Sequence, residues 1–127
     1  MSEGNPIVSV LVVDDDPFLR MMMQEELELS GFKVTTAADG ADALAQPETL
    51  NQHAVLLIDI VLPGMSGPDV AAAIRAHAPD LKIIYVSGKA DIMEAMELGE
   101  HYAVVNKPYR LADLVSIVRA ASAPASS

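Results

Sequence analysis

Short apolar runs alternate with longer amphipathic segments five times along the chain, and this alternation constrains the fold more than any other feature. Strands are expected at 7–13, 33–37, 54–58, 82–86 and 102–105, and helices at 17–30, 41–46, 66–77, 90–98 and 110–121. The first and third runs are β-branched and nearly all apolar, as in strands buried on both faces. Strands that alternate with helices predict an α/β fold, a doubly wound five-stranded parallel sheet with helices on both faces.

Local signals set the helix boundaries. Asp16 can cap the first helix, Pro17 suits its first position, and Gly31 can end it. Pro47 is expected to stop the short helix at 41–46. The boundaries of these helices are therefore expected to follow caps and prolines.

The chain of 127 residues suits a single domain. Its size allows burial of roughly two-thirds of the surface that the unfolded chain exposes. We expect an N-terminal extension at 1–6, the domain at 7–121, and a flexible tail of small and polar residues at 122–127. The sequence has no cysteine, which excludes disulfides, thiolate zinc sites and cysteine nucleophiles.

The chain is strongly acidic, with 18 acidic against 8 basic residues and a net charge of −10. This balance argues against direct contact with nucleic acid or with an anionic membrane surface. No apolar run approaches the roughly 20 residues of a membrane-spanning helix. The first residues lack the basic and apolar parts of a signal peptide. We therefore expect a cytoplasmic location.

Chemically active side chains follow four of the five expected strands. In an open α/β sheet, binding sites form beyond the carboxyl ends of the strands. The residues at these ends are Asp14, Asp15 and Asp16 after the first strand, Asp59 after the third, Ser87 after the fourth and Lys107 after the fifth. Each alone could be a helix cap, a turn former or a solvated loop residue. Their occurrence together at one sheet edge favours a shared site.

The residue types at this edge suit phosphoryl chemistry. Clustered carboxylates raise one another's pKa unless a cation compensates. Oxygen ligands without His or Cys suit Mg²⁺, for which Mn²⁺ can substitute, and do not suit zinc. A divalent cation, a carboxylate nucleophile, a hydroxyl and a fixed ammonium together can hold a phosphoryl group.

These segments resemble the receiver domain of two-component response regulators, the CheY-like family. The resemblance rests on VLVVDDDP at 10–17, LIDIVLPGMSG at 57–67, Ser87-Gly88 and Lys107-Pro108, and it covers about residues 7–120. It implies a flavodoxin-like (βα)5 fold with strand order 2-1-3-4-5. It also implies a cis peptide bond between Lys107 and Pro108.

The resemblance implies a phosphoacceptor role for Asp59. A phosphohistidine on a histidine kinase or phosphotransfer protein would donate the phosphoryl group in a Mg²⁺-dependent reaction, and the resulting 4-aspartylphosphate would switch binding of an output protein. The chain would then be a signalling phosphoprotein and not an enzyme, with slow self-dephosphorylation.

Further site residues follow from the same resemblance. Asp14, Asp15, Asp59 and the backbone carbonyl of Val61 would surround the Mg²⁺. Ser87 and Lys107 would bind the phosphoryl group. Asp16 matches no metal ligand of the family, and helix capping is the better role for it.

Two features depart from the family pattern. Receivers commonly carry an aromatic residue three positions before the lysine, and Val104 stands there instead. Tyr102 and Tyr109 are close in sequence but at other spacings. The stretch from Ser87 to Lys107 is also a few residues shorter than is usual in receivers, and the missing residues fall around 89–92. The usual switch that couples a hydroxyl to an aromatic ring is therefore in question.

The first helix carries more large apolar side chains than one buried stripe can hold. We expect the buried stripe to be Leu19, Met23 and Leu27. Partial exposure is expected for Phe18, Met21 and Met22, and methionine is common at adaptable binding surfaces. In the family this helix docks the histidine kinase or phosphotransfer protein.

Three other functions fit less well. A Mg²⁺-dependent phosphatase with an aspartyl nucleophile typically shows Asp-x-Asp, but Val61 stands two residues after Asp59. A dinucleotide- or flavin-binding domain needs a glycine-rich loop where the acidic cluster stands. A degenerate receiver that only binds proteins is disfavoured by the complete residue set. The sequence leaves open whether the chain is free-standing or part of a longer regulator.

Overall fold

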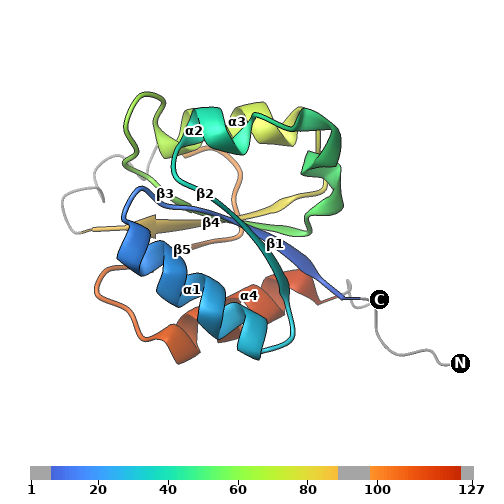
Figure 1. Cartoon of the computed structure of the whole chain (residues 1–127). Helices are drawn as coiled ribbons and strands as arrows, with labels where there is room; N and C mark the ends of the chain where they lie inside the picture. Colours follow the sequence, from blue (N-terminus) through green and yellow to red (C-terminus); the bar gives the residue numbers. More distant parts are fainter. Residues whose placement is uncertain (1–6, 89–97, 124–127) are drawn as a thin grey trace, which may run out of the picture.

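Five parallel strands form one sheet in the computed structural model, which describes residues 7–88 and 98–123 (Figure 1). The strands are β1 (Ser9–Val13), β2 (Lys33–Ala37), β3 (Val55–Asp59), β4 (Lys82–Ser87) and β5 (Ala103–Asn106). Their spatial order is β2-β1-β3-β4-β5. This order confirms the one that the receiver resemblance implies.

Helices cover both faces of the sheet, which confirms the doubly wound arrangement. They are α1 (Pro17–Leu29), α2 (Gly40–Ala43), α3 (Gly67–Arg75) and α4 (Leu111–Ser122), with a 3₁₀ helix η1 (Pro47–Gln52). In Figure 1, α2 and α3 lie on one face, and α1 and α4 lie on the other. The helix expected at 90–98 falls outside the described residues except for its last position. Within the described ranges, no helix is long and apolar enough to cross a membrane.

The segment after β2 differs from the sequence-based expectation. The helix expected at 41–46 spans only Gly40–Ala43, and η1, which the sequence did not indicate, follows it. Pro47 was expected to end a helix, but it begins one, because its fixed φ and missing N–H suit a first helical position. Leu50 in η1 is buried against the α2–α3 side of the sheet, which holds the segment down.

The start and end of α1 agree with the sequence signals. The Asp16 carboxylate accepts hydrogen bonds from the backbone N–H groups of Phe18 at 2.9 Å and Leu19 at 3.2 Å. Pro17 is the first helical residue. Gly31 follows the helix with φ of +100°, a conformation that glycine adopts without strain. These contacts fix where α1 begins, directly after the acidic loop that ends β1.

Two apolar layers enclose the central strands. Along β1, Val10 and Val12 pack toward α1 and α4, whereas Leu11 and Val13 pack toward α2 and α3. Burying a side chain of this size stabilises a fold by about 1.5–3 kcal/mol, so each layer contributes strongly. Burial on both faces explains the unbroken apolar runs and fixes the positions at which β1 and β3 end.

Candidate functional site

Three carboxylates meet at the carboxyl ends of β1 and β3. The two strands are neighbours, and Val13 pairs with Ile58 just before the acidic residues. One carboxylate oxygen from each of Asp14, Asp15 and Asp59 lies within 4.8 Å of the others. Asp14 and Asp59 are buried, whereas Asp15 is exposed. The structure thus brings together the acidic residues that the sequence pattern predicts at this edge.

The Asp14 carboxylate has one satisfied and one unsatisfied oxygen. Its Oδ1 accepts a hydrogen bond from the Asp16 backbone N–H at 2.8 Å, whereas its buried Oδ2 has no hydrogen-bond partner among the residues that the structure describes. Burial raises the pKa of Asp14 and outweighs the lowering effect of the Asp16 N–H. The charges of Asp59 and Asp15 also raise this pKa, and the Lys107 ammonium lowers it. A divalent cation would satisfy Oδ2 and offset the like charges, so these residues fit Mg²⁺.

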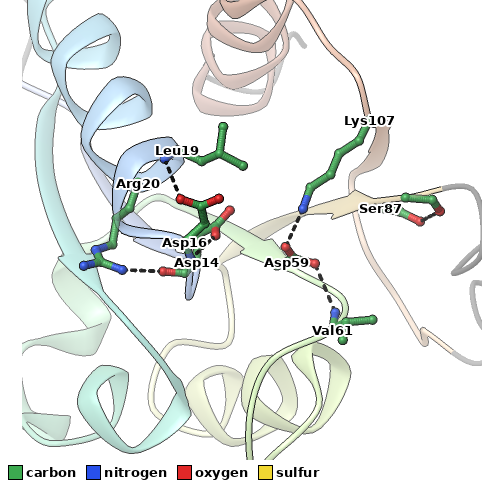
Figure 2. A network of polar contacts seen from close by, with 9 residues as sticks. Asp14, Asp16, Leu19, Arg20, Asp59, Val61, Ser87 and Lys107 are labelled. Carbon is green, nitrogen blue, oxygen red and sulfur yellow. Dashed lines mark hydrogen bonds and ion pairs between the residues drawn. The ribbon is translucent and has the colours of Figure 1, made fainter.

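Arg20 braces the acidic loop. Its guanidinium donates a hydrogen bond to the backbone carbonyl of Asp14 at 2.7 Å, as Figure 2 shows. The backbone N–H of Asp14 donates to the carbonyl of Ala37 at 3.2 Å. Together these bonds fix the backbone where β1 becomes α1. Sequence reasoning missed Arg20, although a basic residue one helical turn after an acidic triplet is a usable signal.

Asp59 is the last residue of β3, and both of its carboxylate oxygens are bound. Oδ2 accepts from the Lys107 ammonium at 2.7 Å, and Oδ1 accepts from the Val61 backbone N–H at 3.1 Å (Figure 2). The side chains of Asp59 and Lys107 are 5% and 32% exposed. Burial lowers the pKa of Lys107, but its hydrogen bond with Asp59 and the charges of Asp59 and Asp14 raise it overall. The ammonium therefore stays charged beside the carboxylate.

Ser87 reaches the same sheet edge, but its hydroxyl is engaged elsewhere. The side chain is buried, and the hydroxyl donates to the carbonyl of Gly88 at 2.9 Å. The Ser87 backbone carbonyl accepts from the Lys107 N–H at 2.7 Å, which joins the ends of β4 and β5. The Lys107–Pro108 peptide bond is cis, as the resemblance implies. Of the two expected phosphoryl-binding side chains, Lys107 is hydrogen-bonded to Asp59, whereas Ser87 is hydrogen-bonded to Gly88.

Gly67 lets α3 pack directly against the end of β3. A Cβ at this position would overlap the backbone oxygen of Asp59 and lie 2.9 Å from the Ile60 Cα. The Gly67 N–H donates to the Ile60 carbonyl at 2.8 Å, so the two backbones are in contact. This role was not predictable from the sequence, because Ser66-Gly67-Pro68 indicates only the start of a helix.

A model of the response regulator receiver domain family matches residues 10–119. The probable transcriptional regulatory protein TcrX of Mycobacterium tuberculosis is 35% identical over 123 residues, which cover 94% of this chain and 51% of that protein. The DNA-binding response regulator MtrA of Mycolicibacterium smegmatis is 38% identical over 114 residues, which cover 87% of this chain and 49% of that protein. The chain therefore spans about half the length of these curated relatives.

Solved structures give the same picture. A response regulator receiver domain protein from Clostridium thermocellum matches with a TM-score of 0.81 and 27% identity, over 91% of this chain and 94% of that chain. The chemotaxis response regulator CheY4 of Vibrio cholerae matches with a TM-score of 0.78 and 25% identity, over 91% of this chain and 99% of that chain. The similarity therefore extends over nearly the whole chain.

Proposed function

The chain belongs to the response regulator receiver domain family, and from this premise we propose that it accepts a phosphoryl group on Asp59. The observation that carries the proposal is the buried Asp59 carboxylate. It is held by Lys107 and by the Val61 N–H, beside an Asp14 carboxylate with a free buried oxygen. The donor would be a phosphohistidine on a histidine kinase or a phosphotransfer protein.

The transfer is a displacement at phosphorus. One Asp59 oxygen attacks the phosphorus of the phosphohistidine, an O–P bond forms, and the P–N bond breaks with its electron pair left on the imidazole nitrogen. The product is an aspartyl phosphate. The Lys107 ammonium and the Val61 N–H orient the carboxylate before the attack, which lowers the entropic part of the barrier.

A divalent cation fits beside the nucleophile. Asp14, Asp15, Asp59 and the Val61 carbonyl are the groups that would hold it, and the free Oδ2 of Asp14 supports this assignment. When bound, Mg²⁺ supplies positive charge that offsets the charge on the phosphoryl oxygens. Asp16 acts as the α1 cap and stays outside this set.

Phosphorylation would rearrange the β4 and β5 side of the site. Lys107 would pair with a phosphoryl oxygen, and the Ser87 hydroxyl would leave the Gly88 carbonyl to donate to another oxygen. Val104 packs against the α2–α3 layer and offers no aromatic ring to move with Ser87. The switch that we propose therefore depends on Ser87 and Lys107 and not on an aromatic residue at position 104.

The exposed face of α1 is the proposed docking site for the phosphoryl donor. Phe18 and Met21 are 62% and 56% exposed, and Met22 is half-buried. Apolar side chains so close to the acidic loop give a partner both contact area and access to Asp59. Substituting Phe18 by Ala should slow phosphotransfer from the histidine donor. Leu29→Ala, at an exposed position on the far end of α1, is the matched control and should leave the rate unchanged.

We further propose that the domain acts in the cytoplasm as a signalling phosphoprotein without enzymatic turnover and passes its state to an output protein. Val61 follows Asp59 by two residues, and its apolar side chain cannot activate water for hydrolysis. The net charge of −10 argues that this domain makes no direct contact with nucleic acid. The DNA binding in MtrA's name describes that longer protein.

Phosphotransfer from a panel of histidine kinases tests the proposal. Intact mass spectrometry should detect one phosphoryl group on the wild type and none on Asp59→Asn. Asp16→Asn keeps an N-cap side chain and should be labelled like the wild type, so it controls for general loss of acidic charge. Incorporation that survives Asp59→Asn would place the phosphoryl group elsewhere and refute the proposal.

A further inference from the structure

Tyr109 carries a buried hydroxyl and lies two residues after Lys107, whose ammonium bonds to Asp59. Its ring packs against the apolar layer between the sheet and the α1–α4 pair. The hydroxyl oxygen is buried and has no hydrogen-bond partner among the described residues. Burial raises the pKa of this phenol, the charges of Asp14, Asp59 and Asp16 raise it further, and Lys107 lowers it. Because Lys107, two residues earlier, is hydrogen-bonded to Asp59 at 2.7 Å, the chain places Tyr109 beside the acidic site, in agreement with these charge effects.

A matching acceptor exists at the same site. Within the described ranges, the buried side-chain atoms without a partner are Asp14 Oδ2, Arg75 Nε and Tyr109 Oη. Arg75 lies in α3, on the other face of the sheet. The remaining two are a donor and an acceptor, and both belong to the acidic site, since Tyr109 follows by two residues the Lys107 that bonds to Asp59. Leaving both unpaired in the interior is costly, so a link between them through one water is favourable.

We propose that Tyr109 is a positioning residue of the cation site. Its hydroxyl donates a hydrogen bond to one bridging water, which in turn donates to Asp14 Oδ2, and this link holds the carboxylate in the orientation that receives the cation. A carboxylate oxygen has two lone pairs, so Oδ2 can accept this bond and still face a cation. The inference rests on the proposed function, because the cation is the one that assists phosphorylation of Asp59.

The Mg²⁺ dissociation constant of Tyr109→Phe tests the proposal. Phenylalanine keeps the ring and its packing and removes only the hydroxyl. Loss of a hydrogen bond to a ligating carboxylate should weaken Mg²⁺ binding by about tenfold, the lower end of the range for such partners. The matched control is Tyr102→Phe, because Tyr102 is 45% exposed, and it should bind Mg²⁺ like the wild type.

The outcomes separate the two proposals. A role in packing alone would lower the melting temperature of Tyr109→Phe and leave its Mg²⁺ dissociation constant at the wild-type value, which would overturn the positioning role. The proposed function would still stand, since the wild type would still bind Mg²⁺. Failure of the wild type itself to bind Mg²⁺ would overturn both.

A second measurement can overturn the proposal on the wild-type protein alone. Mg²⁺ binding should alter the ultraviolet difference spectrum of tyrosine in the wild type and in Tyr102→Phe, because the Tyr109 hydroxyl bonds to a group beside the cation. The change should be absent in Tyr109→Phe. A tyrosine spectrum that does not respond to saturating Mg²⁺ in the wild type would overturn the proposal, even if Tyr109→Phe failed to fold.

Discussion

The carboxyl ends of β1 and β3 supply one half of the site, those of β4 and β5 supply the other, and the hydrogen bonds differ between the halves. In the β1–β3 half, Asp14, Asp15 and Asp59 already lie within 4.8 Å of one another. In the β4–β5 half, Lys107 reaches across to Asp59 at 2.7 Å, whereas the Ser87 hydroxyl bonds to the Gly88 carbonyl.

The difference follows from how each half is supported. Arg20 holds the Asp14 carbonyl, and Gly67 lets α3 pack directly on the backbone of Asp59. Both central strands are also buried on both faces, so their ends have little freedom. The β1–β3 half is therefore ready for a cation. In the function that we propose, the β4–β5 half exchanges hydrogen bonds on phosphorylation, and we expect the response to phosphorylation to begin there.

Gly67→Ala should disrupt the β1–β3 half of the site more than any other substitution considered below. Its Cβ would overlap the Asp59 backbone oxygen, so the variant should lose about 3 kcal/mol of unfolding free energy, at the upper end for overpacking. It should also lose Mg²⁺ binding. Gly64→Ala is the control, because Gly64 has φ of +77° and no atom within 4 Å of an added Cβ. Strain alone should cost it about 1 kcal/mol, with Mg²⁺ binding kept. Equal stability of the two variants would argue against the backbone contact.

Asp14→Asn should separate the need for a cation from the stability of the fold. At about 100 times the dissociation constant, Mg²⁺ should stabilise the wild type by roughly 2.7 kcal/mol, and the variant should lose most of this gain. Without Mg²⁺ the variant should be the more stable, by on the order of 1 kcal/mol or several degrees in Tm, because a buried like charge is removed. Thermal unfolding with Mg²⁺ and with chelator measures both. A lower Tm for Asp14→Asn in chelator would contradict this view of the cluster.

Lys107→Ala tests the contact that joins the two halves. Removing the ammonium leaves the Asp59 carboxylate buried without its cationic partner. The cost without Mg²⁺ should be roughly 1–2 kcal/mol, less than for a fully buried pair because solvent reaches Lys107. Ser87→Ala should change the stability of the unphosphorylated protein by less than about 1 kcal/mol, since among the described residues its hydroxyl bonds to the Gly88 carbonyl alone. Urea unfolding measures the unfolding free energy of both variants. A larger loss of unfolding free energy in Ser87→Ala than in Lys107→Ala would contradict this prediction.

The pH dependence of the Mg²⁺-free protein gives the smallest effect. Burial in the folded protein raises the pKa of Asp14 above its ordinary value of 3.8. Between 3.8 and that raised value the folded state holds more protons than the unfolded state, so the contribution of Asp14 to stability falls as pH rises. The unfolding free energy of the wild type relative to Asp14→Asn should therefore decline through this window and level off above it. A difference that grows with pH would have the wrong sign.

Much of the fold could be predicted because burial shapes the sequence directly. Strands enclosed by two layers must be apolar along their whole length, so β1 and β3 were recognisable. The start of α1 at Asp16 and its end at Gly31 were predictable because they depend on local backbone geometry: free N–H groups that need an acceptor, and a positive φ that suits glycine. The role of Pro47 was not predictable in the same way, because a proline can end one helix or begin the next. The burial of Leu50 in the core favours a helix that begins at Pro47.

The candidate site was predictable in its residue types but not in its contacts. Strand ends place Asp14, Asp59 and Lys107 at one edge in any fold of this class. The hydrogen bond from the Ser87 hydroxyl to the Gly88 carbonyl depends on the side-chain and backbone conformation at these two residues, which no pattern in the sequence encodes. The close approach at Gly67 likewise arises from two segments that meet only after folding.

The proposed function is tested most directly by measuring how the rate of Asp59 phosphorylation depends on the Mg²⁺ concentration. A small acyl phosphate can serve as the donor, so that no kinase or nucleotide competes for the cation, and intact mass spectrometry follows the product. If Asp59 is the phosphoacceptor and Mg²⁺ assists the transfer, the rate should saturate with Mg²⁺, with a midpoint equal to the dissociation constant from thermal unfolding, and Asp59→Asn should stay unlabelled. Labelling that proceeds at full rate in excess chelator, or that persists in Asp59→Asn, would contradict it.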